Sequence, residues 1–173
     1  MLFRSFINEG AELCEGSSFI EKSSAWDKDK IPAGAIYKEL LDIAPEVMPR
    51  QNLKHYFFGE IVATKKGLRL QGFHHARNYP ERIKEILIPP NDMGVYKAIY
   101  QHNGLEKMST FFPNSWSRVT VLKKISEAYK NPIEFTEYGV IGKTSEGMKI
   151  QMWFLKNDKT NFKLIINSAY PVL

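Results

Sequence analysis

Residues 94–112 read GVYKAIYQHNGLEKMSTFF, and this stretch gives the clearest structural signal in the chain. A strand pattern from Gly94 to His102 and a second from Lys107 to Phe112 flank the dipeptide Asn103-Gly104. Successive side chains of a β-strand point to opposite faces of the sheet, so a sequence pattern with a period of two residues is typical of a strand. Asn-Gly favours a two-residue hairpin turn. The stretch therefore predicts an antiparallel hairpin.

On the C-terminal side of this hairpin, the pattern predicts one helix and then more strands. Pro113-Asn114-Ser115 would open the helix, and Asn131-Pro132 would end it. Its apolar stripe would be Val119, Leu122, Ile125 and Tyr129, with Lys123, Lys124 and Lys130 facing away. Residues 149–154 alternate again, and after a turn at Asn157-Asp158 a last strand would run through Phe162, Leu164 and Ile166 towards Ser168.

On the N-terminal side, residues 1–50 are predicted to be helical. Apolar residues recur there at helical spacing, and a second helix would follow Pro32 over residues 33–43. From Leu53 onward the chain becomes rich in aromatic and β-branched residues, which favours strands. The prediction is an α+β fold: N-terminal helices, then two antiparallel-sheet lobes with one inserted helix. The expected regions are 1–50, helical, and 51–173, one compact bilobal unit.

Composition and charge narrow the class of protein. With 173 residues, 43% of them apolar, the chain can bury a core, and its single cysteine, Cys14, excludes an internal disulfide and a Cys-rich zinc site. No apolar segment approaches the roughly 20 residues of a membrane span, and the N-terminus has no signal-peptide pattern. Residues 1–50 carry a net charge of −3, whereas residues 51–110 and 111–173 each carry +4. This excess favours a polyanionic partner, although a solvated lysine-rich surface has the same composition.

Two of the four histidines are candidates for catalysis. His55 and His74 lie next to apolar or glycine residues, and two converging imidazoles can act as base and acid near neutral pH. His75 would point away from His74 if both lay on a strand, so only one could enter a given site. A single histidine is more often a hydrogen-bonded structural residue, and His102, beside the hairpin turn, fits that description best and should be exposed.

Other residues could complete a site for cleaving a phosphodiester. Lys107 could neutralise the charge that builds up on the phosphorane, although lysines at strand edges are common. Ser168 and Tyr170 would share one face of a strand, where a ring can stack on a sugar or base and a hydroxyl can contact a base edge. Tyr170 could equally be packed in the sheet.

Four motifs occur in an order that resembles a known family. They are His55-Tyr-Phe-Phe-Gly-Glu60, Gly72-Phe-His74, Lys107-Met-Ser-Thr-Phe-Phe-Pro-Asn-Ser-Trp116 and Ser168-Ala-Tyr170-Pro171. Together they resemble the bacterial EndoU-type ribonuclease domain, and more distantly they are similar to the coronaviral uridylate-specific endoribonuclease. The resemblance covers about residues 50–173.

The resemblance implies a role for each matching residue. His74 would be the general base, His55 the general acid and Lys107 the charge-stabilising group. Tyr170 would orient the ribose and Ser168 would lie near the base, with Thr110 as a further substrate contact. The chain departs from the viral enzyme in the longer spacing between the histidines, where residues 63–67 resemble an extended loop. It also has serine at position 168, where the family has threonine or serine.

The expected function is a metal-independent endoribonuclease that requires no cofactor; manganese is possible but not expected. It would cut RNA, with tRNA as the expected target, by attack of the 2′-hydroxyl, leaving a 2′,3′-cyclic phosphate and a 5′-hydroxyl. The resemblance implies a toxin domain of an interbacterial competition system such as contact-dependent growth inhibition. Such a toxin is secreted or delivered into the cytoplasm of a neighbouring cell and is paired with an immunity protein.

Three alternatives are also consistent with the sequence. The first is a basic RNA-binding module without catalysis. The second is a metal site built from His55, His74, His75 and Glu60. The third is a structural interaction protein.

Overall fold

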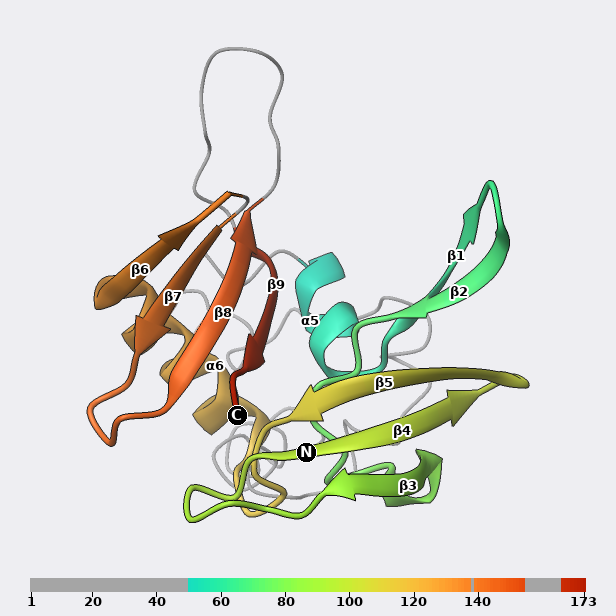
Figure 1. The fold of residues 1–173 in the computed structure, drawn as a ribbon, viewed down its shortest axis with the longest axis horizontal. Helices are drawn as coiled ribbons and strands as arrows, with labels where there is room; N and C mark the ends of the chain where they lie inside the picture. The colour runs from blue at the N-terminus through green and yellow to red at the C-terminus, as the bar shows by residue number, and fades with distance from the viewer. Residues whose placement is uncertain (1–49, 138, 155–165) are drawn as a thin grey trace, which may run out of the picture.

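The computed structural model describes residues 50–137, 139–154 and 166–173 (Figure 1). In chain order the elements are α5 (Arg50–Phe57), β1 (Glu60–Thr64), β2 (Gly67–Gln71), the 3₁₀ turn η2 (Pro80–Arg82), β3 (Ile83–Ile88), β4 (Tyr96–His102), β5 (Leu105–Phe111), α6 (Arg118–Lys130), β6 (Pro132–Thr136), β7 (Gly139–Lys143), β8 (Lys149–Phe154) and β9 (Ile166–Pro171). Neither α5 nor α6 is long and apolar enough to cross a membrane.

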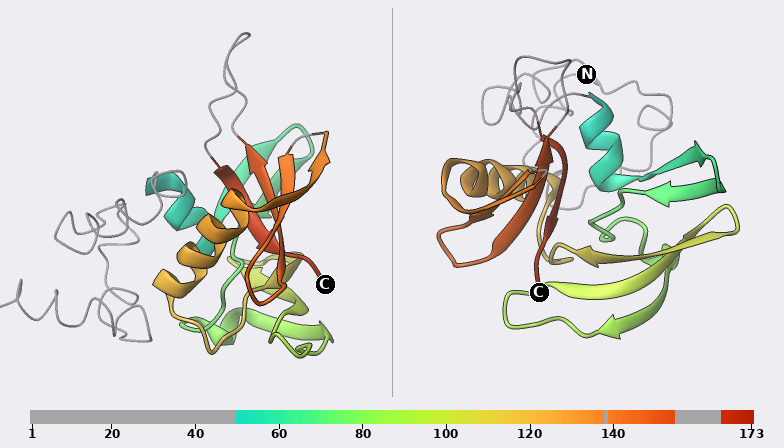
Figure 2. Two further views of the ribbon diagram at one scale, coloured as in Figure 1. Left: turned by 90° about the vertical axis from the view of Figure 1, so that its left-hand side faces the viewer. Right: turned by 45° about the horizontal axis from the view of Figure 1, so that its top comes forward.

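The strands form three antiparallel sheets. β1 and β2 make a hairpin, β3-β4-β5 a three-stranded sheet and β6-β7-β8-β9 a four-stranded sheet. α6 packs on one face of the four-stranded sheet, and α5 lies beside β9 (Figures 1 and 2). The described residues therefore have the predicted α+β character, dominated by antiparallel sheets. The predicted N-terminal helices lie outside the described residues.

Each of the two larger sheets has its own hydrophobic core. The core of the four-stranded sheet also includes both helices, with Leu53, Tyr56, Phe57, Val121, Leu122, Ile125, Ile150, Met152 and Ile166 among its buried residues. The core of the three-stranded sheet contains Leu70, Phe73, Ala76, Tyr96, Ala98, Tyr100 and Phe111. Two neighbouring cores leave a seam between them, and a cleft lies along this seam.

The hairpin predicted from the Asn-Gly dipeptide is confirmed. β4 and β5 pair in register from Tyr96 with Phe111 to His102 with Leu105. Asn103 and Gly104 have φ angles of 49° and 77°, and positive φ at both positions is the signature of a type I′ turn. The second strand begins at Leu105, two residues earlier than predicted.

The inserted helix and the strand at 149–154 are also confirmed. α6 begins at Arg118 rather than at Pro113, because the hydroxyl of Ser117 caps it by accepting from the Thr120 amide (3.0 Å). Leu122 and Ile125 of the predicted stripe are buried. The last strand is β9, whereas Phe162, Leu164 and the Asn157-Asp158 turn lie outside the described residues.

The prediction of strands from Leu53 onward is wrong for the first described segment. Residues 50–57 form α5, and Leu53, Tyr56 and Phe57 are fully buried on one face of it. Their spacing of three and four residues is the helical pattern, but in so short a segment the aromatic residues gave an equally good strand pattern. The strands begin at Glu60.

Backbone hydrogen bonds join the end of α5 to the segment that follows β2. The amide of Phe73 donates to the carbonyl of His55 (2.7 Å), and the amide of His74 donates to the carbonyl of Tyr56 (2.8 Å). The last carbonyls of a helix have no partner within it, so these two bonds satisfy α5 while fixing the 73–74 segment. His55 and His74 are thereby held side by side, although 19 residues separate them in sequence.

Gly72 allows this close approach. Its φ is +70°, and a Cβ atom placed there would lie 2.1 Å from the carbonyl oxygen of His55. Gly72 therefore permits a close contact between the two backbone segments. Any larger residue would have to separate α5 from the segment that carries His74.

We expect Gly72→Ala to destabilise the protein more than Gly104→Ala does. Gly104 is the matched control, because its φ is +77° but a Cβ there would meet no atom within 4 Å. The control should lower the free energy of unfolding by about 1 kcal/mol from backbone strain alone. Gly72→Ala should lower it by about 3 kcal/mol, since the clash adds to the strain. Equal losses in urea unfolding would contradict the close contact.

Candidate active site

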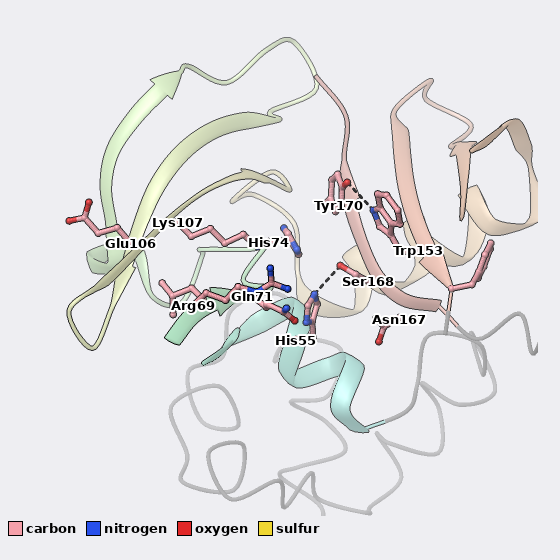
Figure 3. A pocket seen from close by; sticks show the side chains of 12 residues that line it. His55, Arg69, Gln71, His74, Glu106, Lys107, Trp153, Asn167, Ser168 and Tyr170 are labelled. Atoms are coloured by element: carbon pink, nitrogen blue, oxygen red, sulfur yellow. Dashed lines mark hydrogen bonds between the residues drawn. The ribbon is translucent and has the colours of Figure 1, made fainter. Parts of the chain in front are cut away.

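A cleft of about 680 Å³ opens between the two sheet lobes. It is lined by residues of α5, β2, β5, β8 and β9 together with His74, namely His55, Arg69, Leu70, Gln71, His74, Glu106, Lys107, Trp153, Phe154, Asn167, Ser168 and Tyr170 (Figure 3). Five of the six residues predicted for the site, His55, His74, Lys107, Ser168 and Tyr170, therefore lie in one cleft.

The two imidazoles face each other. The ring centroids of His55 and His74 are 5.8 Å apart. The Nε2 atom of His55 lies 2.9 Å from the hydroxyl oxygen of Ser168, and its Nδ1 atom lies 3.9 Å from a carboxylate oxygen of Glu60. α5 thus supplies one ring, and β9 supplies the hydroxyl that orients it.

The protonated nitrogen of His74 is set by two groups on β5. Its Nδ1 atom lies 2.9 Å from the hydroxyl oxygen of Ser109 and 3.3 Å from the carbonyl oxygen of Thr110. A carbonyl can only accept, and the Ser109 hydroxyl donates to that same carbonyl (3.4 Å), so its oxygen is left to accept from the ring. The neutral ring therefore carries its proton on Nδ1, and the lone pair is on Nε2.

Both rings are held in the neutral form. Burial, and then the charge of Lys107, lowers the pKa of His55 from 6.5 to about 4. Burial lowers the pKa of His74 well below 6.5, and His55 and Lys107 lower it further, while the bond to the Thr110 carbonyl raises it. A neutral imidazole at pH 7 can accept a proton and act as a general base. To act as a general acid, an imidazole must first be protonated, and negative charge nearby favours this form by raising its pKa.

Lys107 belongs to a second group of charges in the cleft. Burial, and then the charge of Arg69, lowers its pKa. Its charge in turn reaches both imidazoles, so the ammonium group lies within electrostatic range of the place where they meet.

Tyr170 stands over His74. The two ring centroids are 5.3 Å apart with an interplanar angle of 32°, and the indole of Trp153 donates a hydrogen bond to the phenol oxygen (2.9 Å). The ring of Tyr170 is thus held in place from β8, and Tyr170 lines the cleft.

Thr110, the sixth predicted residue, does not line the cleft. Its hydroxyl donates to the carbonyl of Pro171 (2.7 Å), which joins β5 to β9, and its own carbonyl contacts His74. The structure thus places Thr110 where it holds the site together from outside the cleft.

The remaining histidines do not join the pair. His75 is buried on the other side of the chain, where its Nε2 atom donates to the carbonyl of Trp116 (3.0 Å) and its ring meets Phe57 edge-on. His55, His74 and His75 therefore do not converge as a metal site would require, and no cluster of three or more metal-binding side chains occurs in the described part of the chain. His102, expected to be exposed, is partly exposed at the end of β4.

Sequence reasoning missed several residues of the cleft. Ser109 could have been noticed because it lies two positions after Lys107 and so shares a face of β5 with it. The positions of Arg69, Gln71 and Trp153 depend on how the hairpin and the two sheets meet, and no local pattern reports that.

Comparison with known proteins gives two matches. The family model described as bacterial EndoU nuclease matches residues 49–173. A protein named "Toxin" from Bacillus cereus is 39% identical over 132 residues, which cover 69% of this chain. The match spans 22% of that relative's length, so most of the relative has no counterpart here.

We predict that Ser109→Ala changes the tautomer of His74. Loss of the hydroxyl removes the closer partner of Nδ1, and a hydrogen bond worth about 1 kcal/mol corresponds to roughly a fivefold change in the tautomer ratio. Nitrogen-15 chemical shifts of the imidazole measure this ratio directly. Ser168→Ala is the matched control, because it removes a hydroxyl bonded to His55 instead. An unchanged His74 spectrum in Ser109→Ala would show that Ser109 does not set the tautomer.

Proposed function

The chain belongs to the bacterial EndoU nuclease family, and from this membership and the cleft we propose that it is an endoribonuclease that works without a metal ion. The observation that carries the proposal is the pair of imidazoles 5.8 Å apart, with a lysine ammonium in the same cleft. Attack of an RNA 2′-hydroxyl on the adjacent phosphodiester is catalysed by a base, an acid and a cation. Groups of these three kinds line the cleft.

His74 is the general base in this proposal. Its Nε2 lone pair takes the proton from the 2′-hydroxyl, and the 2′-oxygen then forms a bond to phosphorus. Ser109 and the Thr110 carbonyl support this role, because they hold the ring's own proton on Nδ1. The low pKa of His74 keeps the ring neutral before substrate arrives.

His55 is the general acid. As the bond from phosphorus to the 5′-oxygen breaks, the imidazolium gives its proton to that oxygen, leaving a 2′,3′-cyclic phosphate and a 5′-hydroxyl. Before RNA binds, His55 is neutral at pH 7, since its pKa is about 4. The negative charge of the RNA raises this pKa, and the carboxylate of Glu60, 3.9 Å from Nδ1, favours the same charged form.

In this proposal Lys107 stabilises negative charge, and two residues of β9 position the nucleotide. The ammonium group of Lys107 neutralises the charge that builds up on the non-bridging oxygens of the phosphorane. Tyr170, fixed by Trp153, presents a ring against which a ribose can lie, and Ser168 places a hydroxyl near the base of the bound nucleotide.

We further propose that the domain is the toxin of an interbacterial competition system, delivered into the cytoplasm of a neighbouring cell. The similarity to a Bacillus cereus protein named "Toxin", which is several times longer, supports this assignment. tRNA is the proposed target. An acidic immunity protein that covers the basic cleft would protect the producing cell.

The test is cleavage of total tRNA by the purified protein in EDTA, with detection of 2′,3′-cyclic phosphate ends. We expect cleavage in EDTA. His74→Ala and His55→Ala should each lower the rate by about 10²–10⁴-fold, the usual contribution of a general base or acid. His102→Ala is the control histidine, because His102 lies outside the cleft and should leave the rate unchanged.

Two results would overturn this assignment. Loss of all cleavage in EDTA, restored by a divalent ion, would show that a metal does the chemistry. Tight RNA binding by a wild-type protein that cleaves no faster than the two histidine variants would instead identify a basic RNA-binding module.

A further inference from the structure

Two cations stand at the β2–β5 side of the cleft. Lys107 comes from β5 and Arg69 from β2, and both line the cleft near His74 (Figure 3). Arg69 is close enough to lower the pKa of Lys107. Two like charges at this distance repel each other, and the repulsion is relieved when an anion binds between or beside them.

The nearest carboxylates do not neutralise this pair. Glu106 lines the cleft, but its carboxylate accepts from the ammonium group of Lys84 (2.5 Å). The carboxylate of Glu60 lies 3.9 Å from Nδ1 of His55. Within residues 50–137, 139–154 and 166–173, neither Arg69 nor Lys107 forms an ion pair. The excess positive charge is therefore available to a ligand.

Arg69 is held in position by its neighbour on β2. With the amide oxygen of Gln71 facing the guanidinium, this oxygen accepts from Nη2 (2.6 Å) and Nε (3.2 Å) of Arg69. The two residues are two positions apart, so they share one face of the strand. A guanidinium oriented by one partner still has N–H groups free in its plane, and this plane matches the oxygens of a phosphate.

One cation is enough for the reacting phosphate, and Lys107 has that role in the proposed mechanism. We propose that Arg69, oriented by Gln71, forms a second phosphate-binding subsite, which takes the phosphodiester next to the one that is cleaved. This inference rests on the proposed ribonuclease function. It makes a strand of at least three nucleotides the preferred substrate.

The shape of the β1–β2 hairpin supports the same path for the RNA. The hairpin extends away from the β3-β4-β5 sheet towards its own turn (Figure 1), and Lys65 and Lys66 are exposed at this turn. Arg69 lies nearer the cleft on the same hairpin, which has Glu60 as its single acidic residue. A nucleic acid that leaves the cleft past Arg69 thus meets further positive charge.

The test compares two substrates with the same cleaved dinucleotide. One has a single phosphodiester, and the other is an oligoribonucleotide with phosphates on both sides. We expect Arg69→Gln to lower the ratio of kcat/KM for the long substrate over the short one by about tenfold, mostly through KM. Lys149→Gln is the matched control, because Lys149 is exposed at the end of β8 opposite to Trp153 and should leave both values unchanged.

Neutral methylphosphonates identify the bound phosphate. In the wild type, replacing the phosphate bound by Arg69 should lower kcat/KM for the long substrate about as much as Arg69→Gln does. In the Arg69→Gln variant, the same replacement should lower kcat/KM only slightly further. The salt dependence of long-substrate binding should also fall by about 0.7 in slope, the value for one phosphate of a single strand.

Two outcomes overturn the subsite. In one, Arg69→Gln lowers kcat/KM equally on both substrates, which places Arg69 on the reacting phosphate. In the other, a methylphosphonate at either flanking position lowers kcat/KM by the same factor in the wild type and in Arg69→Gln, which means that Arg69 contacts neither phosphate. Binding of 2′-deoxy versions of the substrates gives the same comparison without cleavage, so failure of the subsite is distinguished from failure of the ribonuclease assignment.

Discussion

Two backbone hydrogen bonds determine the geometry of the site: those from the amides of Phe73 and His74 to the carbonyls of His55 and Tyr56. They join the C-terminal end of α5 to the segment that contains Phe73. The apolar face of α5 belongs to the core of the four-stranded sheet, and Phe73 belongs to the core of the three-stranded sheet. The imidazoles of His55 and His74 meet at this junction because the backbone that carries them is already paired. Gly72 is required there, since a Cβ atom would occupy the space of the His55 carbonyl.

The same junction explains the electrostatics. Rings at the seam between two cores are removed from water, and burial is the largest cause of the low pKa of each. Lys107 and Arg69 add positive charge with no carboxylate bonded to either within the described part of the chain. The cleft thus holds neutral imidazoles beside cations without a bonded carboxylate, and a bound polyanion would stabilise this arrangement.

Local patterns predicted the local parts of this fold. The Asn103-Gly104 turn and the stripe of α6 each depend on neighbouring residues, so the sequence was enough. α5 was missed because eight residues rich in aromatics suit a helix or a strand equally well until their burial is known. The order of the four motifs singled out five residues that line the cleft, His55, His74, Lys107, Ser168 and Tyr170. Ser109, Arg69 and Gln71 were not found, because their places depend on how β2, β5 and the His74 segment pack together.

The most direct measurement is the titration of both imidazoles by NMR, with and without a bound 2′-deoxy oligonucleotide, which has no 2′-hydroxyl and cannot be cleaved by the proposed route. We expect His55 in the free protein to titrate near pH 4 and His74 well below 6.5, and both pKa values to rise when the polyanion binds. Imidazole pKa values near 6.5 in the free protein, or pKa values that do not change when the nucleic acid binds, would contradict the proposed electrostatics of the cleft.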